Sequence, residues 1–491
     1  MRRITDFRTR MLAFLWVFGC TALAASPAAA QAPQVNSGDT AWLLMATSLV
    51  LLMIIPGLAL FYGGLVRTKN VLSVLMQIFT VICLVSILWV IYGYTLTFSG
   101  SPIGTYIGGA SKAFLRGVAT DSVVPTFTNG VAVPEYAFIA FQMAFACLTP
   151  ALIIGAFAER MRFSALLLFV VLWFTLVYIP IAHMSWYWSG PDALADAARA
   201  VMRASTVDAR IRAEARLAAV QADAGLFRQW GVIDFAGGAV VHISAGIAGL
   251  VGAISLGKRA GYGRDSMAPH NLTYAMMGAG LLWVGWFGFN GGSGLRADGT
   301  AALAIINTFM CAAAAGLSWM AAEWLARGKP SMLGLVSGAL TGLVAISSGA
   351  GVVGPLGGIV IGFAAGGLCF WFVTSFKERF GYDDALDVFG VHCVAGVVGV
   401  LAVGILASPK LGGTGLVEYI SKPGQGVVAL YDISAQVWAQ SKAVLVTLVW
   451  SGFLSIRLFK LVDLLVGLRP DEDEEDQGLD AVDHGERAYN H

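Results

Sequence analysis

Two histidines lie in apolar segments and share a local sequence pattern. His242 follows Asp234 by eight residues and precedes an Ala-Gly-x-x-Gly run, and His392 follows Asp384 in the same way. A neutral imidazole has one donor and one acceptor nitrogen, so two imidazoles in contact can share a proton, bind a small polar solute or relay a proton. Ionisable side chains at membrane depth are costly and are therefore functional candidates. The repeated pattern favours a functional pair over two structural histidines.

Other kinds of chemistry fit these histidines less well. A metal site needs three or four ligands, and Cys393 points about 100° away from His392 on a helix. A hydrolase would need a carboxylate to orient the histidine, yet Asp234 lies eight residues from His242, which is about 12 Å along a helix. An isolated intramembrane histidine is more often bonded to neighbouring carbonyls. We expect no metal site, no cofactor and no enzymatic activity.

The composition predicts that membrane-spanning helices position these residues. The chain has 491 residues, of which 57% are hydrophobic and only 12% are charged, as in polytopic membrane proteins. The net charge of +1 gives no field that would attract nucleic acid. We expect an all-α polytopic membrane protein with eleven transmembrane helices. The apolar segments are 41–62, 70–97, 134–156, 164–181, 232–256, 270–289, 300–326, 331–348, 355–376, 385–406 and 435–466.

The two copies of the histidine pattern enter the membrane from opposite sides. His242 lies in the fifth apolar segment and His392 in the tenth, so the copies are five helices apart. This spacing is typical of inverted-repeat transporters, in which equivalent residues lie near a two-fold axis at mid-membrane. A weaker echo pairs Phe61–Gly64 with Phe289–Gly292. We expect helices 1–5 and 6–10 to be inverted repeats, followed by a final helix, and the two histidines to meet.

Charge and length suggest how the chain is oriented. Residues 1–30 combine arginines, a short apolar run and a small-residue cleavage site, which is typical of a signal peptide. Lysines and arginines gather in the short loops that the helix count places in the cytoplasm. We expect the domain 31–466 to span the inner membrane with a periplasmic N-terminus, and 467–491 to be a solvated cytoplasmic tail. The long segment 189–229 is expected to form a solvated helix or helical hairpin outside the membrane.

Asp234 begins the segment that carries His242. A carboxylate at a helix N-terminus accepts backbone N–H groups and opposes the positive end of the helix. A carboxylate near the outer end of a pore also attracts cations. The sequence leaves both roles open for Asp234, and they are compatible.

Longer stretches of the chain resemble the bacterial Amt branch of the Amt/Rh ammonium transporter superfamily. The resemblance runs through almost the whole chain after residue 30, and its motifs are highly specific. It implies a homotrimer, with a cytoplasmic tail that docks on the subunit underside and takes part in block by a trimeric PII-type signalling protein. The matching stretches are Phe61–Gly64, Ala158–Arg160, Ile181–Met184, Asp234–Gly238 through Gly257–Arg259, Gly285–Asn290, Val388–His392 and Asp483–Glu486.

The resemblance also implies an outer vestibule that binds ammonium. Trp186, Phe141 and Ser293 match the family's vestibule residues. An aromatic face attracts a cation, and a serine hydroxyl accepts one of its hydrogens. On its own, an aromatic residue near a helix end is more often an interfacial anchor.

Below the vestibule, Phe145 and Phe289 match a stacked aromatic gate. Phe145 follows Phe141 by four residues and so lies one turn deeper on the same helix face. Two rings that close a pore exclude water and hydrated ions. Ammonium would lose a proton at this gate and cross as ammonia past His242 and His392, with or without a relayed proton.

Two features depart from the family pattern. The segment between Trp186 and Asp234 is much longer than in related bacterial sequences, so it is expected to cover part of the outer rim. The eighth apolar segment ends Ile346-Ser347-Ser348-Gly349 where the family has threonine-proline, which leaves the local backbone uncertain. We expect an ammonium transporter. The alternatives are an ammonium sensor, and a Rh-like channel for ammonia or carbon dioxide, which the Trp186 vestibule disfavours.

Overall fold

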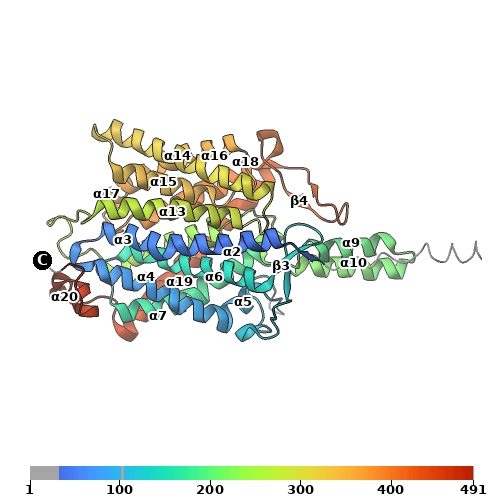
Figure 1. The fold of residues 1–491 in the computed structure, drawn as a ribbon, viewed down its shortest axis with the longest axis horizontal. Helices are drawn as coiled ribbons and strands as arrows, with labels where there is room; N and C mark the ends of the chain where they lie inside the picture. The colour runs from blue at the N-terminus through green and yellow to red at the C-terminus, as the bar shows by residue number, and fades with distance from the viewer. Residues whose placement is uncertain (1–32, 101–103, 490–491) are drawn as a thin grey trace, which may run out of the picture.

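The computed structural model describes residues 33–100 and 104–489, so the predicted signal peptide lies outside the described residues. Long helices run side by side along one axis and form a bundle (Figure 1). In the described part of the chain, ten helical runs are long and apolar enough to cross a membrane. They are Ser37–Leu65, Thr68–Phe98, Glu135–Phe157, Phe163–Trp186, Gly238–Leu256, Leu272–Gly292, Gly299–Arg327, Pro355–Phe380, Phe389–Leu406 and Ile433–Val466.

The predicted all-α multi-pass architecture is confirmed, and ten of the eleven predicted segments correspond to these runs. The remaining segment, 331–348, forms the apolar helix α15 (Met332–Ile346), which has only 15 residues. It packs against both α14 (Gly299–Arg327) and α16 (Pro355–Trp371), which also contact each other. The helix ends at Ile346, and the chain then turns through 347–352. This turn forms hydrogen bonds with the segment that leads to His242.

Several runs are built from consecutive α-helical and other helical turns. The first half contains α2 (Ser37–Leu52), η1 (Met53–Leu58), α3 (Ala59–Leu65), η2 (Thr68–Asn70), α4 (Val71–Leu88), η3 (Trp89–Gly93), α5 (Tyr94–Phe98), η4 (Ala113–Leu115), α6 (Glu135–Ile153), η5 (Ile154–Phe157), α7 (Phe163–Trp173), η6 (Phe174–Tyr178), α8 (Ile179–Trp186), α9 (Pro191–Arg203), α10 (Val207–Ala222), α11 (Leu226–Gln229), η7 (Gly238–Ile243) and α12 (Ser244–Leu256). The second half adds α13 (Leu272–Gly292), η8 (Phe372–Phe376), α17 (Lys377–Phe380), η9 (Phe389–Val394), α18 (Ala395–Leu406), η10 (Pro409–Leu411), α19 (Ile433–Val466), α20 (Glu472–Gln477) and α21 (Leu479–His484). Two small sheets cover one end of the bundle, with strands β1 (Gln34–Val35), β2 (Val123–Pro125), β3 (Val131–Pro134), β4 (Val417–Glu418) and β5 (Val427–Val428).

The two histidines lie in equivalent irregular turns. His242 belongs to the π-helical turn η7 and His392 to the π-helical turn η9. Each turn continues into a regular helix, α12 or α18, that carries the Ala-Gly-x-x-Gly run of the repeated pattern. π-Helical turns are rare overall and are frequent at functional sites.

Glycines let the two histidine-bearing helices cross at very short range. A Cβ atom at Gly246 would lie 2.6 Å from the Cβ of Cys393 in the partner turn. A Cβ atom at the equivalent Gly396 would lie 2.9 Å from Ile243 and 3.0 Å from the carbonyl oxygen of Gly238. Small residues at such crossings allow two backbones to touch. The glycines of the repeated pattern are therefore what brings η7 and η9 together.

The C-terminal tail is docked against the bundle. The Asp480 carboxylate accepts the backbone N–H of Ser73 in α4 at 2.7 Å, and the Arg469 guanidinium donates to the carbonyl oxygen of Leu256 in α12 at 3.0 Å. The side chains of Glu475, Leu479 and Asp480 are buried. The composition-based prediction of a solvated tail is therefore wrong for α20 and α21, because specific acids pair with the bundle, and the docking implied by the family resemblance fits instead.

The long segment 189–229 forms a helical hairpin, one of the two forms that the sequence predicted. Helices α9 and α10 pack against each other and project from the end of the bundle opposite to the tail (Figure 1). The carboxylate of Asp192 ties α9 to the loop between β2 and β3 by accepting the Gly130 N–H at 2.9 Å. The hairpin thus stands over the end of the bundle that carries the small sheets.

The crossing makes a prediction about stability. Replacing Gly246 with alanine should lower the free energy of unfolding by about 1–3 kcal/mol, because the added methyl group forces the two helices apart. Thermal unfolding of the detergent-purified protein measures the loss. Gly280→Ala is the matched control, since a Cβ atom at Gly280 meets nothing within 4 Å. Equal unfolding temperatures for the two variants would contradict the close crossing.

Candidate functional site

The structure brings the two predicted histidines together. The Nδ1 atoms of His242 and His392 lie 3.3 Å apart, and the rings are nearly parallel, with centroids separated by 5.4 Å and an angle of 11°. A hydrogen bond between two Nδ1 atoms requires one of them to carry a proton and the other to be free, so the pair holds one proton between the rings. The Nε2 atom of His242 is buried and has no hydrogen-bond partner in the described residues. One edge of the pair is therefore available to a solute.

Trp286 supports the histidine pair from behind, and the sequence reasoning did not assign it a role. Its ring stacks on His242 with centroids 5.4 Å apart, and its Nε1 atom donates to the Ser347 hydroxyl at 2.9 Å. Ser347 in turn donates to the carbonyl oxygen of Leu343 at 2.8 Å. Trp286 precedes Phe289 by three residues, which places both side chains on one face of the helix. This spacing could have predicted that Trp286 lies at the site.

Ser347 and Ser348 stand where the family has threonine-proline, and their main chain bonds to the segment that precedes His242. The carbonyl oxygen of Ser347 accepts the N–H of Ala236 at 2.8 Å, and that of Ser348 accepts the N–H of Phe235 at 3.0 Å. These bonds fix the chain just before the His242 turn. The serine pair therefore positions the site through its main chain as well as through the Ser347 hydroxyl.

Asp234 caps the turn that carries His242. Its Oδ2 atom accepts the backbone N–H groups of Ala239 at 3.0 Å and Val240 at 3.1 Å, while Oδ1 is buried without a partner in the described residues. Asp384 accepts two backbone N–H groups at the start of η9 in the same way, at 3.0 and 2.7 Å. The predicted capping contact is thus present, and the repeated pattern repeats it.

Two phenylalanine rings cover the histidines on one side. Phe145 and Phe289 stack with centroids 4.2 Å apart at an angle of 22°. The ring of Phe289 lies 6.0 Å from that of His242. Phe145, Phe289 and His242 are at most 1% exposed. A continuous chain of four rings therefore runs from Phe145 to His392.

A cavity of about 550 Å³ lies on the Phe145 side of this chain, and we call it the outer cavity because the sequence predicts that this end faces outside. Trp186, Ser293 and Asp234 line it together with Phe145. The Trp186 Nε1 atom donates to the carbonyl oxygen of Asp234 at 2.9 Å, which orients the indole. Ser293 donates its hydroxyl hydrogen to the carbonyl oxygen of Phe289 at 2.8 Å, so its oxygen lone pairs remain free to accept from a donor in the cavity.

Phe141 differs from the other vestibule residues. Its side chain is fully buried and does not line the outer cavity; its ring edge lies against Phe145, with centroids 5.0 Å apart. Two residues that the sequence reasoning left out do line the cavity, namely Gln142 and Ser185. The Oε1 atom of Gln142 and the hydroxyl of Ser185 are buried without partners in the described residues. Both are therefore acceptors available to an N–H donor, and only tertiary packing distinguishes them from Phe141.

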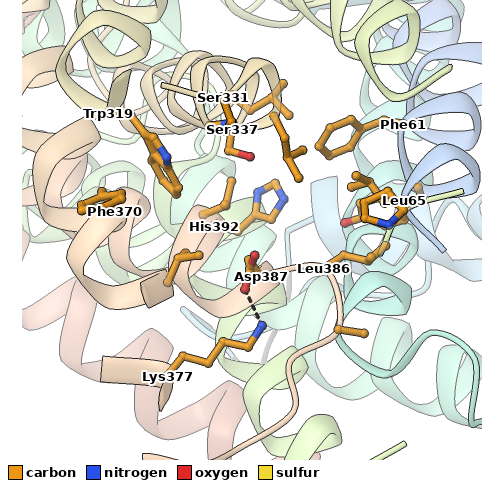
Figure 2. A pocket seen from close by; sticks show the side chains of 18 of the residues that line it. Phe61, Leu65, Trp319, Ser331, Ser337, Phe370, Lys377, Leu386, Asp387 and His392 are labelled. Carbon is orange, nitrogen blue, oxygen red and sulfur yellow. Dashed lines mark hydrogen bonds and ion pairs between the residues drawn. The ribbon is translucent and has the colours of Figure 1, made fainter. Parts of the chain in front are cut away.

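A second cavity, of about 470 Å³, lies on the other side of the histidine pair, and we call it the inner cavity. The His392 ring projects into it, and Trp319 and Phe370 lie together to one side of His392 (Figure 2). Below His392, Lys377 and Asp387 form an ion pair at 2.6 Å (Figure 2). The cavity on this side of the buried rings is thus also lined by charged side chains.

This architecture defines a class of protein. Helices that cross a membrane enclose two cavities, and buried rings that include a histidine pair separate them. Such an arrangement suits the passage of a small solute across a membrane.

Comparisons with known proteins identify the family. The model of the Ammonium Transporter Family matches residues 41–489. The ammonium transporter of Bacillus subtilis is 45% identical over 457 residues, which are 93% of this chain and 99% of that protein. Two solved structures are also similar. The Sensor Amt Protein has a TM-score of 0.75 at 27% identity, with 91% of this chain and 98% of that chain covered. Saccharomyces cerevisiae Mep2 has a TM-score of 0.73 at 29% identity, with 92% and 93% covered.

The chain therefore belongs to the ammonium transporter family. It is a multi-pass membrane protein that transports ammonium and is not an enzyme, as the sequence predicted.

Capping by Asp234 can be tested through stability. Asp234→Ala should destabilise the protein by about 1–2 kcal/mol, since two buried N–H groups lose their acceptor. Thermal unfolding in detergent measures the effect. The exposed Asp208 in the first turn of α10 supplies the control, and Asp208→Ala should leave the unfolding temperature nearly unchanged. A harmless Asp234→Ala substitution would mean that the cap does not hold the turn.

Proposed function

We propose that each subunit recruits ammonium in the outer cavity and passes ammonia through the chain of rings. The observation that carries the proposal is the histidine pair, buried between two polar-lined cavities. In the outer cavity, Trp186 offers an aromatic face to a cation, and Ser293 offers a free acceptor. Asp234 adds a carboxylate that is oriented by the backbone. Phe141 does not line the outer cavity, and it acts by packing against the ring of Phe145 and holding that ring in place.

The ring chain then selects the neutral form of the solute. Phe145 and Phe289 leave no room for a hydration shell. A cation would therefore have to lose its water between these rings, and few polar contacts there would compensate for the loss. Ammonium can give up a proton to a water or an acceptor in the outer cavity, but potassium has none to give. The pathway therefore selects ammonium over a metal ion of similar size by its acidity.

The histidine pair gives ammonia polar contacts in an otherwise apolar barrier. The free Nε2 edge of His242 can exchange a hydrogen bond with the solute, and the shared Nδ1 proton fixes the orientation of both rings. On the far side, ammonia reaches the inner cavity beside His392 and regains a proton from water. The same pair also provides a route for a relayed proton, so net ammonia transport and net ammonium transport share this pathway.

We also propose the family's assembly and orientation for this chain. The subunits form a homotrimer in the inner membrane, with the N-terminus in the periplasm after cleavage of 1–30, and 31–466 form the membrane domain. The hairpin within 189–229 stands in the periplasm and the tail 467–491 in the cytoplasm, where a PII-type signalling protein blocks the pore from the side of the inner cavity. The opposite positions of hairpin and tail in the bundle (Figure 1) support this orientation.

The likeness to the Sensor Amt Protein favours one second candidate, an ammonium sensor. A pure sensor would bind ammonium in the outer cavity without net uptake. Time-resolved uptake of methylammonium into proteoliposomes distinguishes the two functions. Transport predicts accumulation beyond what the added protein could bind, whereas a sensor predicts one equivalent or less per chain.

Removing both imidazoles tests the pathway. The double variant His242→Ala, His392→Ala should lose at least about tenfold in methylammonium uptake, because a solute without polar partners in the barrier costs about 1–3 kcal/mol more. Uptake into proteoliposomes measures the rate. Cys393→Ala changes the next residue of the same turn and should transport normally. Undiminished uptake by the double variant would count against the proposal.

The outer cation site makes a separate prediction. Trp186→Leu should raise the apparent KM for methylammonium by about two- to thirtyfold, the equivalent of a lost cation–π contact. Concentration series of uptake in proteoliposomes provide the KM. Trp438→Leu is the matched control, because Trp438 is exposed on the outside of α19. An unchanged KM for Trp186→Leu would remove this residue from the recruitment site.

A further inference from the structure

Arg228 lines the same outer cavity as Trp186 and Ser293. It belongs to α11, which ends the long segment 189–229. Its guanidinium has five N–H donors, yet it has neither a hydrogen bond nor a carboxylate within ion-pair distance in the described residues. Arginine is permanently charged. The cavity thus contains a fixed positive charge without a neighbouring counter-charge.

The other cations of this cavity are neutralised. Lys112 forms an ion pair with the buried carboxylate of Glu135. Arg296 lies 3.6 Å from the Asp39 carboxylate and 3.5 Å from that of Asp298. Arg228 is therefore the one cavity-lining cation in the described residues that lacks a carboxylate partner.

Aromatic rings hold Arg228 in place. The guanidinium lies 4.1 Å from the Trp188 ring centroid and 6.0 Å from that of Phe127. The two rings are stacked on each other with centroids 5.9 Å apart. Tyr419 packs against Trp188 at 5.7 Å, and its hydroxyl donates to the carbonyl oxygen of Phe127 at 2.6 Å. These rings come from three separate segments, and their contacts favour the position of the guanidinium beside Trp188.

A held positive charge in a cation-recruiting cavity opposes recruitment. Arg228 and Trp186 line one cavity of about 550 Å³, so a cation beside Trp186 shares that cavity with the guanidinium. The Debye length is about 8 Å at physiological ionic strength and about 30 Å at about 0.01 M salt, so the repulsion is strongest at low salt. We propose that Arg228 sets the affinity of the outer site, because its charge weakens the binding of cations there. The inference rests on the proposed outer recruitment site.

The test compares the salt dependence of the apparent KM for methylammonium in proteoliposomes. Arg228→Gln should lower the KM by about two- to tenfold at low ionic strength. The difference from the unsubstituted protein should shrink between about 0.01 M and about 0.15 M salt, where the Debye length falls from about 30 Å to about 8 Å. Arg228→Lys keeps the charge and should behave like the unsubstituted protein.

The controls separate charge from packing. Arg216→Gln removes an exposed arginine of α10 that does not line the cavity, and it should leave the KM unchanged. Equal KM values for Arg228→Gln and the unsubstituted protein at both salt concentrations would overturn the proposal. So would an Arg228→Lys variant that resembles Arg228→Gln, since that result assigns the effect to packing. If Trp186→Leu also leaves the KM unchanged, the recruitment site itself fails and the role of Arg228 falls with it.

Discussion

The structure depends on one close crossing, between the helices that carry His242 and His392. Glycines at equivalent positions remove the side chains that would keep the two backbones apart, and the π-helical turns aim one imidazole from each helix at the other. Two imidazoles can share a hydrogen bond only when their nitrogen atoms approach to about 3 Å. The repeated sequence pattern thus supplies the residues that bring His242 and His392 into contact.

The rest of the site keeps that contact oriented and dry. Asp234 and Asp384 satisfy the first N–H groups of the two turns, and Trp286 covers the face of His242. Phe145 and Phe289 close the outer side with a stacked pair of rings. Charged side chains line the two cavities, whereas the rings between them are buried. This division is the physical basis of the proposed selectivity.

The sequence predicted those parts of the molecule that depend on periodicity and on repeated local patterns. Apolar segment length predicted the bundle, and the duplicated pattern predicted that His242 and His392 meet. What it missed depends on tertiary contact. Helical spacing placed Phe141 and Phe145 on one face, but only the packing of α6 shows that Phe141 lies behind the wall while Gln142 lines the cavity. The acidic composition of the tail suggested that it is solvated. Composition alone cannot show that the Asp480 carboxylate accepts a hydrogen bond from the buried N–H of Ser73.

The central claim is that the dry segment passes the solute only in neutral form. The most direct measurement is the electrical current of the unsubstituted protein in planar bilayers or liposomes, with ammonium and potassium gradients applied in turn across a range of pH. The account predicts that potassium gradients produce no current at any pH, while ammonium gradients produce uptake that an excess of potassium does not abolish. A potassium current comparable in size to the ammonium flux would contradict it, because potassium could cross the histidine segment only as a charged ion.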